Sequence, residues 1–329
     1  MTNVLVTGGA GYIGSHTCKA LALAGYTPVT YDNLVYGHEW AVKWGPLETG
    51  DILDKARLSQ VLEKYQPKAI MHFAAYAYVG ESVQNPGKYY RNNTAGALSV
   101  LETASDHSIK NLVFSSTCAT YGAPSKVPIV EDETQSPINP YGASKLMVER
   151  MLSDFDIAHG MRSASLRYFN AAGADPDGEI GEDHNPETHL IPLVLDAACG
   201  LRPAITVFGN DYDTLDGTCI RDYVHVCDLA DAHVLALRAL EDGASSLAVN
   251  LGNGHGFSVK EVIDTAQRVT GRSIPVEYGP RREGDPPALV GDATKACNLL
   301  GWQPRLGALD DIIDTAWKWH YKHFATSRG

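Results

Sequence analysis

VLVTGGAGYIG, residues 4–14, joins a short apolar run to a loop with glycines at positions 8, 11 and 14. The apolar run predicts a buried strand, and His16–Ala24 predicts a helix soon after the loop. Glycine permits the tight turn and lets the backbone approach a pyrophosphate, while the helix N-terminus offers free N–H groups. Gly8, Gly11 and Gly14 therefore predict a dinucleotide-binding loop that opens a βαβ unit.

An acidic residue stands where such a loop needs one. Asp32 follows Gly14 by 18 residues and closes the second predicted strand, Pro28–Tyr31. A carboxylate at that place accepts hydrogen bonds from the adenosine ribose and repels a 2′-phosphate. The spacing predicts NAD as the cofactor in preference to NADP.

Strand-like runs alternate with helical stretches along the first half of the chain. The strands are predicted at 4–7, 28–31, 69–73, 112–115 and 163–167, and the helices at 16–24, 55–65, 89–104 and 141–159. This alternation predicts an α/β fold of Rossmann type, with a doubly wound parallel sheet covered on both faces. Because the composition changes after Asn170, we expect an NAD-binding domain over 1–170 and a smaller α/β substrate domain over 171–329. The strand and helix of segment 221–240 can return to the first domain.

The bulk composition excludes several classes of protein. The chain has 329 residues, 44% of them hydrophobic, and a net charge of −12 without any basic cluster, so we expect no nucleic-acid partner. It shows neither a signal peptide nor an apolar run of about 18 residues, so we expect a cytoplasmic protein that does not span a membrane. Its six cysteines lack C-x-x-C or His/Cys pairing, so we expect neither disulfides nor a metal.

The sequence NPYGASK places Tyr141 and Lys145 four residues apart at the start of a predicted helix. Both side chains then lie on one face of that helix. A tyrosine with an ordinary pKa near 10 is a poor base at neutral pH. A neighbouring ammonium and a cationic nicotinamide stabilise the phenolate, so the pair predicts a general base whose pKa is lowered toward the working range.

The GxxGxxG spacing resembles the extended short-chain dehydrogenase/reductase superfamily. Further motifs resemble its UDP-glucose (UDP-galactose) 4-epimerases along almost the whole chain, among them SSTCATYG (115–122), NPYGASKLMVE (139–149), LRYFNAAGA (166–174) and RREGD (281–285). The resemblance implies an isomerase that inverts C4 of a UDP-sugar through a transient 4-keto intermediate with tightly bound NAD. It also implies a homodimer that packs through the helices at 89–104 and 141–159.

Site residues follow from the same resemblance. The catalytic group is Tyr141 with Lys145 and Thr117, whose hydroxyl would stabilise the 4-oxygen. Contacts with NAD are assigned to Gly8, Gly11, Tyr12, Ile13, Gly14, Asp32, Asn33, Asp51, Ile52, Phe73, Ala74, Ala75, Asn92, Ser115, Tyr141, Lys145, Tyr168 and Phe169. Contacts with the UDP-sugar are assigned to Thr117, Tyr141, Asn170, His189, Leu190, Thr206, Val207, Phe208, Arg221, Arg282, Asp285 and Leu289.

Three departures from the family pattern leave the identity of the substrate's sugar open. Ala77 replaces a lysine that contacts the cofactor, His189 replaces an asparagine at the diphosphate, and Leu289 stands where a bulkier residue restricts N-acetylated sugars. UDP-GlcNAc is therefore an alternative substrate. UDP-arabinose/UDP-xylose is another, because the segments around residues 76 and 118 also resemble the pentose 4-epimerases.

Other activities on this fold are less consistent with the residues. Nucleotide-sugar 4,6-dehydratases carry an Asp-Glu pair after the catalytic Thr, and here that pair is Cys118-Ala119. A non-enzymatic NAD-sensing regulator would lose the Tyr/Lys pair, which this chain keeps. A net oxidoreductase would exchange its cofactor, whereas an epimerase should purify with NAD bound.

Overall fold

The structure, a computed structural model, describes residues 2–282 and 285–325 and is organised around a seven-stranded sheet. All its strand pairs are parallel, in the order β11-β6-β5-β4-β1-β2-β3. The strands are β1 (Thr2–Thr7), β2 (Tyr26–Asp32), β3 (Leu47–Thr49), β4 (Ala69–His72), β5 (Asn111–Thr117), β6 (Arg162–Tyr168) and β11 (Leu247–Leu251). The predicted α/β sheet is confirmed, and each of the five predicted strands is present.

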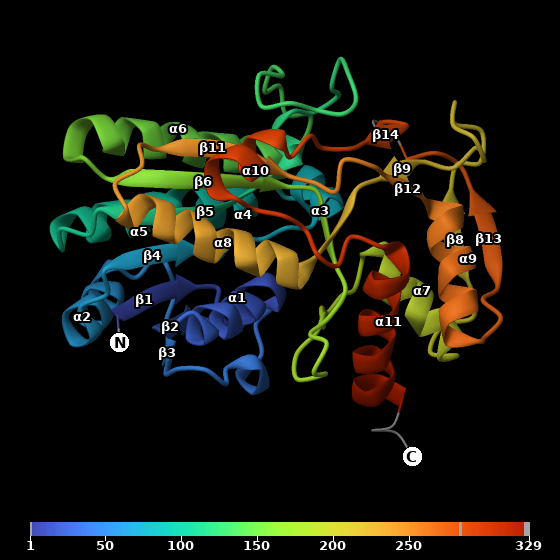
Figure 1. The fold of residues 1–329 in the computed structure, drawn as a ribbon, viewed down its shortest axis with the longest axis horizontal. Coiled ribbons are helices and arrows are strands. Elements are labelled where there is room, and N and C mark those ends of the chain that lie inside the picture. The colour runs from blue at the N-terminus through green and yellow to red at the C-terminus, as the bar shows by residue number, and fades with distance from the viewer. Residues whose placement is uncertain (1, 283–284, 326–329) are drawn as a thin grey trace.

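Helices cover both faces of this sheet (Figure 1). Because side chains alternate along a strand, Val4 and Val6 face one layer while Leu5 faces the other. The first layer contains α1 (Tyr12–Leu23), α8 (Val226–Glu241) and α10 (Thr294–Leu300), and the second contains α2 (Lys55–Tyr65), α5 (Gly96–Asp106) and α6 (Pro140–His159). The sheet is therefore buried between two apolar cores.

The predicted helices differ from the observed ones mainly at their ends. The helix at 55–65 is confirmed to the residue, and α6 begins one residue before the predicted start. The single helix predicted over 89–104 is divided into α4 (Pro86–Tyr89), a π-helical turn (Tyr90–Ala95) and α5. Short α3 (Val79–Gln84) precedes them, and 3₁₀ turns stand at Glu39–Ala41 and Cys118–Thr120.

The second half of the chain builds a smaller α/β unit beside the sheet (Figure 1). Its helices α7 (Leu190–Ala198), α9 (Val259–Thr270) and α11 (Leu309–His320) enclose a separate apolar core, and a π-helical turn (Tyr321–Ala325) follows α11. Its strands pair as β7 (Asn170–Ala172) with β10 (Tyr223–His225), β8 (Ile205–Phe208) with β13 (Val276–Gly279), and β12 (Phe257–Ser258) with β9 (Ile220–Arg221) and β14 (Ala288–Leu289). Residues 173–189, between β7 and α7, form no helix or strand.

Two later segments lie with the first half of the chain. Helix α8 packs against α1, and β11 completes the sheet beside β6. The chain thus crosses between the two parts more than once, and the division at residue 170 stays a prediction. Among the described residues, no helix combines the length and apolar character that crossing a bilayer requires.

The strand register decides where a ligand can be reached. Thr7 lies opposite both Tyr31 and His72, and Thr117 lies opposite Tyr168, so the carboxyl ends of these strands reach one edge of the sheet. The chain builds outward from β1 to β3 on one side and continues at β4 on the other. In open α/β sheets, the crevice beyond such a reversal is the usual ligand site.

Candidate active site

The loop between β1 and α1 has the geometry of a pyrophosphate cradle. Gly8 has φ +74°, and a β-carbon there would lie 2.6 Å from the Ala74 nitrogen. A β-carbon on Gly14 would lie 2.2 Å from the Gly8 oxygen, so only glycine fits at either position. Gly11 caps α1 without a side-chain hydrogen bond, which leaves the N-terminal N–H groups available to an anion. These residues fit a bound dinucleotide.

The acidic residue predicted for the ribose is held at the end of β2. Its carboxylate accepts hydrogen bonds from the backbone N–H groups of Ala10 (3.0 Å) and Leu34 (2.9 Å). Burial raises the pKa of Asp32, and these two donors partly oppose that shift. Close by, Asn33 donates to the Asp51 carboxylate at 3.0 Å. The structure thus brings three of the predicted adenosine-side residues to one edge.

Gly37 is a residue of this edge that sequence reasoning missed. A β-carbon there would lie 2.9 Å from both carboxylate oxygens of Asp32. The glycine is therefore needed for the backbone to pass so close to the acid. The side chain of Ile52, by contrast, is buried in the core against Gly96, so only its backbone could contact a cofactor.

Backbone hydrogen bonds to the end of β1 fix the loop after β4. The N–H groups of Phe73 and Ala74 both donate to the Thr7 oxygen, at 2.9 and 3.1 Å. This contact places Phe73, Ala74 and the following Ala75 beside the glycine loop. Asn92 donates to Asn93, and the buried Asn93 bonds both backbone groups of Tyr76 and the Ser144 hydroxyl.

Asn93 was not predicted, although it belongs to the site's framework. Its side chain joins three segments: the π-helical turn, the loop after β4 and helix α6. A π-turn inside a helical stretch shifts the side-chain phase and often marks a functional region. The Asn-Asn pair was visible in the sequence, but helical periodicity cannot show which of the two points inward.

Tyr141 and Lys145 stand in the first turns of α6. Asn139 caps this helix by accepting the Gly142 N–H at 2.8 Å, and Pro140 occupies the first helical position. The buried Lys145 amine donates to the Ser115 oxygen at 2.7 Å and lies 4.9 Å from the Phe114 ring centre. Burial lowers the pKa of Lys145 to about 7, and Glu149 partly opposes this shift.

The phenol of Tyr141 is also shifted toward its neutral form. Burial raises the pKa of Tyr141 to about 12, while a hydrogen bond with the Thr117 hydroxyl lowers it in part. The Lys145 amine bonds the Ser115 carbonyl in this conformation, and its expected stabilisation of the phenolate stays a prediction. A further positive charge must enter the site before the phenol can act as a base at neutral pH.

Three other predicted residues meet at the same place. The Ser115 hydroxyl bonds the Tyr168 hydroxyl, while the Ser115 carbonyl accepts from Lys145. Phe169 packs with Tyr121 and Ile129 at the same end of the sheet. The ends of β5 and β6 and the start of α6 therefore form one continuous polar and aromatic wall.

A buried ion pair below Lys145 was missed by sequence reasoning. Arg167 donates to the Glu149 carboxylate at 2.6 Å and to the Tyr121 hydroxyl at 2.9 Å, and both partners of the pair are 8% exposed. The Ser116 hydroxyl bonds the same carboxylate at 2.5 Å. Glu149 follows Lys145 by four residues on α6, which was a signal in the sequence for a shared helix face.

Residues predicted for the diphosphate pair with each other near this wall. Arg221 forms an ion pair with Asp285, and Arg282 lies 4.3 Å from the ring centre of Phe208. Arg221 also acts electrostatically on Cys118, the residue after Thr117. Arg221 thus lies near the end of β5 that bears Thr117, where a guanidinium could bind a diphosphate in bidentate fashion.

The three residues of β8 that are predicted to contact the substrate differ in how exposed their side chains are. Val207 is buried in the apolar core, so only its backbone is left for a ligand. Thr206 is partly exposed, and Phe208 is 38% exposed. Leu289 packs against the Tyr121 and Phe169 cluster, where it narrows the space beside the catalytic wall.

The loop before α7 carries the remaining predicted residues. His189 is the N-cap of α7, and Leu190 is its first residue. Asn170 lies further back in the chain, at the start of β7, and donates its backbone N–H to the Asp222 oxygen at 2.9 Å. The His189 imidazole contacts Glu182 and Glu187, both at 2.9 Å. These two acids were not predicted, and they restrain the ring at its Nδ1 side.

Comparison with known proteins gives the relationships of this chain. Residues 4–252 match the family model described as "NAD dependent epimerase/dehydratase family". A UDP-glucose 4-epimerase of Rhizobium meliloti (strain 1021) is 55% identical over 318 residues, which cover 97% of each chain.

Solved structures agree with this relationship. A crystal structure of the UDP-glucose 4-epimerase from Brucella ovis in complex with NAD superposes with a TM-score of 0.96, at 56% identity and 99% coverage of both chains. The Bifidobacterium longum UDP-glucose 4-epimerase, in complex with NAD+ and UDP, superposes with a TM-score of 0.92 at 38% identity, over 98% of this chain and 99% of that one.

Proposed function

The chain belongs to the NAD dependent epimerase/dehydratase family, and from this membership we propose that it is a UDP-glucose 4-epimerase with bound NAD. The observation that carries the proposal is the hydrogen bond between Tyr141, at the start of α6, and Thr117, at the carboxyl end of β5. A base and a hydrogen-bonding hydroxyl at this edge can act on one sugar hydroxyl. NAD supplies the hydride acceptor that takes hydrogen from C4 and returns it.

Tyr141 is the proposed general base of this reaction. Its phenolate takes the proton of the 4-hydroxyl and later gives it back from the same side chain. Thr117 donates a hydrogen bond to the 4-oxygen as negative charge develops there. Lys145 orients this end of α6 through its bond to the Ser115 carbonyl. Proton and hydride both leave and return, so the reaction has no net oxidation.

Arg221 and Arg282 are the proposed holders of the diphosphate. Two guanidinium groups can bind several phosphate oxygens at once and fix the UDP end firmly. The sugar end needs weaker contacts, because it must present both faces of C4 to the same base. The Arg221–Asp285 ion pair supports this role by keeping the guanidinium oriented.

Dehydration is excluded as the main activity on the residues beside Thr117. Elimination of water across C5 and C6 requires an acid and a base near the 4-keto sugar. Cys118 and Ala119 follow Thr117 here, and burial raises the pKa of the Cys118 thiol to about 12. A thiol so shifted is not a base at neutral pH.

We also propose a cytoplasmic homodimer. All six cysteines are free thiols, which suits a reducing compartment. The exposed apolar side chains of Leu98 on α5 and Met147 on α6 support pairing through these helices.

The test is a coupled assay of purified protein without added NAD. UDP-galactose, UDP-GalNAc and UDP-arabinose are supplied side by side, and the C4 epimer of each is quantified. We expect conversion of UDP-galactose to UDP-glucose, together with nucleotide released when the protein is denatured. Protein that contains NAD yet leaves C4 of every UDP-sugar unchanged would contradict the proposal, while the three rates rank the hexose, N-acetylhexosamine and pentose alternatives.

A further inference from the structure

Four metal-ligating side chains converge in the loop that joins β7 to α7. Glu182, His184, Glu187 and His189 each offer one ligand atom, and these four atoms all lie within 4.8 Å of one another. All four residues come from one stretch of eight, which ends at the cap of α7. Because the loop has no helix or strand, something other than backbone pairing must fix this conformation.

The separations between the ligand atoms match a small coordination polyhedron. His189 Nδ1 lies 2.9 Å from Glu182 and from Glu187, and His184 Nδ1 lies 3.3 and 3.5 Å from the same two carboxylates. Tetrahedral bonds of about 2.0–2.1 Å to nitrogen and oxygen place neighbouring ligand atoms about 3.3–3.4 Å apart. The four imidazole–carboxylate separations of 2.9–3.5 Å are thus close to the edge length of a tetrahedron around a zinc-sized ion, although Glu187 approaches His189 and His184 with different oxygens.

The orientation of His184 is a second, independent observation. Its Nδ1 atom is buried and makes no hydrogen bond, although two carboxylates are within ion-pair distance. At 3.3 and 3.5 Å, the ring nitrogen lies at nearly equal distances from the two carboxylates and close against neither. Ligands directed at a common centre have this arrangement, whereas a simple imidazolium–carboxylate pair would align its N–H with one oxygen.

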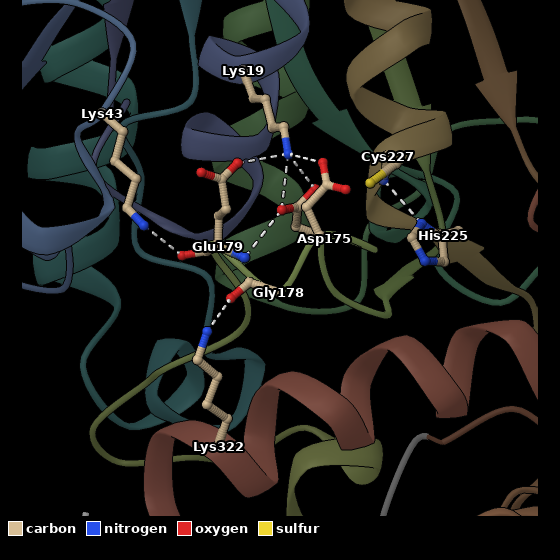
Figure 2. A network of polar contacts seen from close by, with 9 residues as sticks. Lys19, Lys43, Asp175, Gly178, Glu179, His225, Cys227 and Lys322 are labelled. Carbon is tan, nitrogen blue, oxygen red and sulfur yellow. Dashed lines mark hydrogen bonds and ion pairs between the residues drawn. The ribbon is translucent and has the colours of Figure 1, made fainter.

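A nearby acidic cluster gives an internal comparison. Asp175, Asp177 and Glu179 also converge, but the Lys19 amine stands among them at 2.8, 2.7 and 2.8 Å. Figure 2 shows this amine reaching toward Asp175 and Glu179. That cluster already contains its cation in the form of a lysine.

The His/Glu cluster differs in its partners. Within the described residues, the ion pairs of Glu182 and Glu187 are with the two imidazoles alone. Among the described residues, no lysine or arginine forms an ion pair with these two carboxylates as Lys19 does in the acidic cluster.

We propose that Glu182, His184, Glu187 and His189 form a structural site for one divalent transition-metal ion of the zinc type. Two imidazole nitrogens and two carboxylate oxygens are a donor set that suits Zn²⁺ and its neighbours better than Mg²⁺ or Ca²⁺. The site is closed by four protein ligands, so its role is structural. It goes beyond the proposed catalysis, which routes no step through it.

The position of the site explains what the ion does. Two tyrosine rings stand edge-on to the His184 imidazole. The centre of the Tyr12 ring, from the glycine loop, lies 6.3 Å from the imidazole centre, and the centre of the Tyr78 ring, at the cap of α3, lies 6.2 Å from it. The Tyr12 hydroxyl also donates to the Gly173 oxygen at 2.6 Å. The ion therefore locks the loop that bears His189 and Leu190 against the dinucleotide edge.

The experiment measures metal binding on the full-length, untagged protein with its NAD retained. Chelator-treated protein is dialysed and titrated with Zn²⁺ or Co²⁺, and bound metal is counted by elemental analysis. We expect one Zn²⁺ per chain, the intense visible absorption of tetrahedral Co²⁺, and a melting temperature raised by roughly 3–5 °C at a hundredfold excess over Kd.

Variants separate this site from general surface binding. His184→Asn and Glu187→Gln should each lower the Zn²⁺ affinity at least tenfold, because one of four ligands is lost or weakened. Glu179→Gln, in the cluster that Lys19 fills, is the matched control and should leave the affinity unchanged.

The proposal is overturned if wild-type protein keeps no Zn²⁺, if His184→Asn binds it equally well, or if Co²⁺ shows only a weak octahedral spectrum. The spectrum is read on wild-type protein, so it holds even where a variant fails to fold. C4 inversion is assayed separately on each sample. Protein that inverts C4 but binds no Zn²⁺ would overturn only the metal site, and Zn²⁺ binding in a protein that leaves C4 unchanged would overturn only the proposed catalysis.

Discussion

Two residues of the proposed catalytic group have pKa values that move in opposite directions for one reason. Burial raises the pKa of Tyr141 to about 12 and lowers that of Lys145 to about 7. Both shifts favour the neutral form, because a buried charge loses its hydration. At neutral pH the protein by itself therefore holds a neutral phenol beside an amine that is about half protonated, and a positive charge introduced nearby favours the phenolate. An oxidised nicotinamide ring has that charge, so cofactor and base are electrostatically linked.

Replacement of Tyr141 by Phe tests the base directly. The substitution removes one hydroxyl and keeps the ring, so the fold and the diphosphate contacts remain. We expect turnover to fall by roughly 10²–10⁴-fold, the usual contribution of a positioned acid–base group. The UDP dissociation constant, measured by calorimetry, should change less than threefold. A variant that keeps wild-type turnover would remove Tyr141 from this role.

Asp32→Asn tests the assignment of the ribose contact. The amide oxygen keeps an acceptor for the N–H groups of Ala10 or Leu34, while the negative charge is lost. Because the carboxylate repels a 2′-phosphate, its loss should narrow the preference for NAD over NADP by tenfold or more. Reconstitution of cofactor-free protein with each dinucleotide measures this ratio. An unchanged ratio would place the ribose elsewhere.

Among the elements, prediction succeeded where local chemistry decides the structure. Helix α2 was predicted to the residue, and its start is fixed by Asp54, whose side chain accepts the Arg57 N–H at 3.0 Å. The glycine loop was predicted because close backbone approaches at Gly8 and Gly14 exclude every other residue.

Prediction failed where tertiary contacts decide. The π-turn at 90–95 depends on Asn93 bonding Tyr76 and Ser144, which are distant in sequence. The pairing of Glu149 with Arg167 likewise joins α6 to β6. The E-x-H-x-x-E-x-H pattern at 182–189 was overlooked because its spacings fit neither a helix nor a strand. Geometry alone shows that its four side chains meet.

Asp222 joins three loop segments and gives a pH-dependent test. Its buried carboxylate accepts the backbone N–H groups of Asn253 and Gly291. Burial raises its pKa to about 6, from 3.8, although these donors oppose the shift. Between pH 4 and 6 the folded chain binds more protons than the unfolded one, so this group lowers stability as pH rises through that window.

The Asp222→Asn variant should lack this decrease of stability with rising pH, because an amide does not ionise. The free energy of unfolding of the variant, relative to wild type, should therefore increase by up to about 3 kcal/mol from pH 4 to pH 7. Urea denaturation at both pH values measures it, with the exposed Asp264→Asn as control. A difference that does not vary with pH would show that Asp222 titrates normally.

For the whole molecule, we propose that the sheet holds the cofactor and that the smaller unit binds the substrate. Helix α8 and strand β11 follow β8 and β9 in the chain but pack with the large sheet, so the chain crosses several times between the two parts. The catalytic wall at Thr117 and Tyr141 belongs to the part with the large sheet, while Arg221 and Arg282 come from the other part. The ligand would therefore be held between rigid elements on both sides.

The proposed homodimer is testable through the exposed apolar face of α5 and α6. Leu98 and Met147 are 37% and 44% exposed, on two helices that pack against each other. In a twofold interface each residue lies near its own copy, so Leu98→Glu with Met147→Glu would bring like charges together. Light scattering should then give 35.5 kDa in place of twice that mass. Leu23→Glu, at the exposed C-terminal end of α1, should leave the dimer intact, and a dimer that survives the double substitution would place the interface elsewhere.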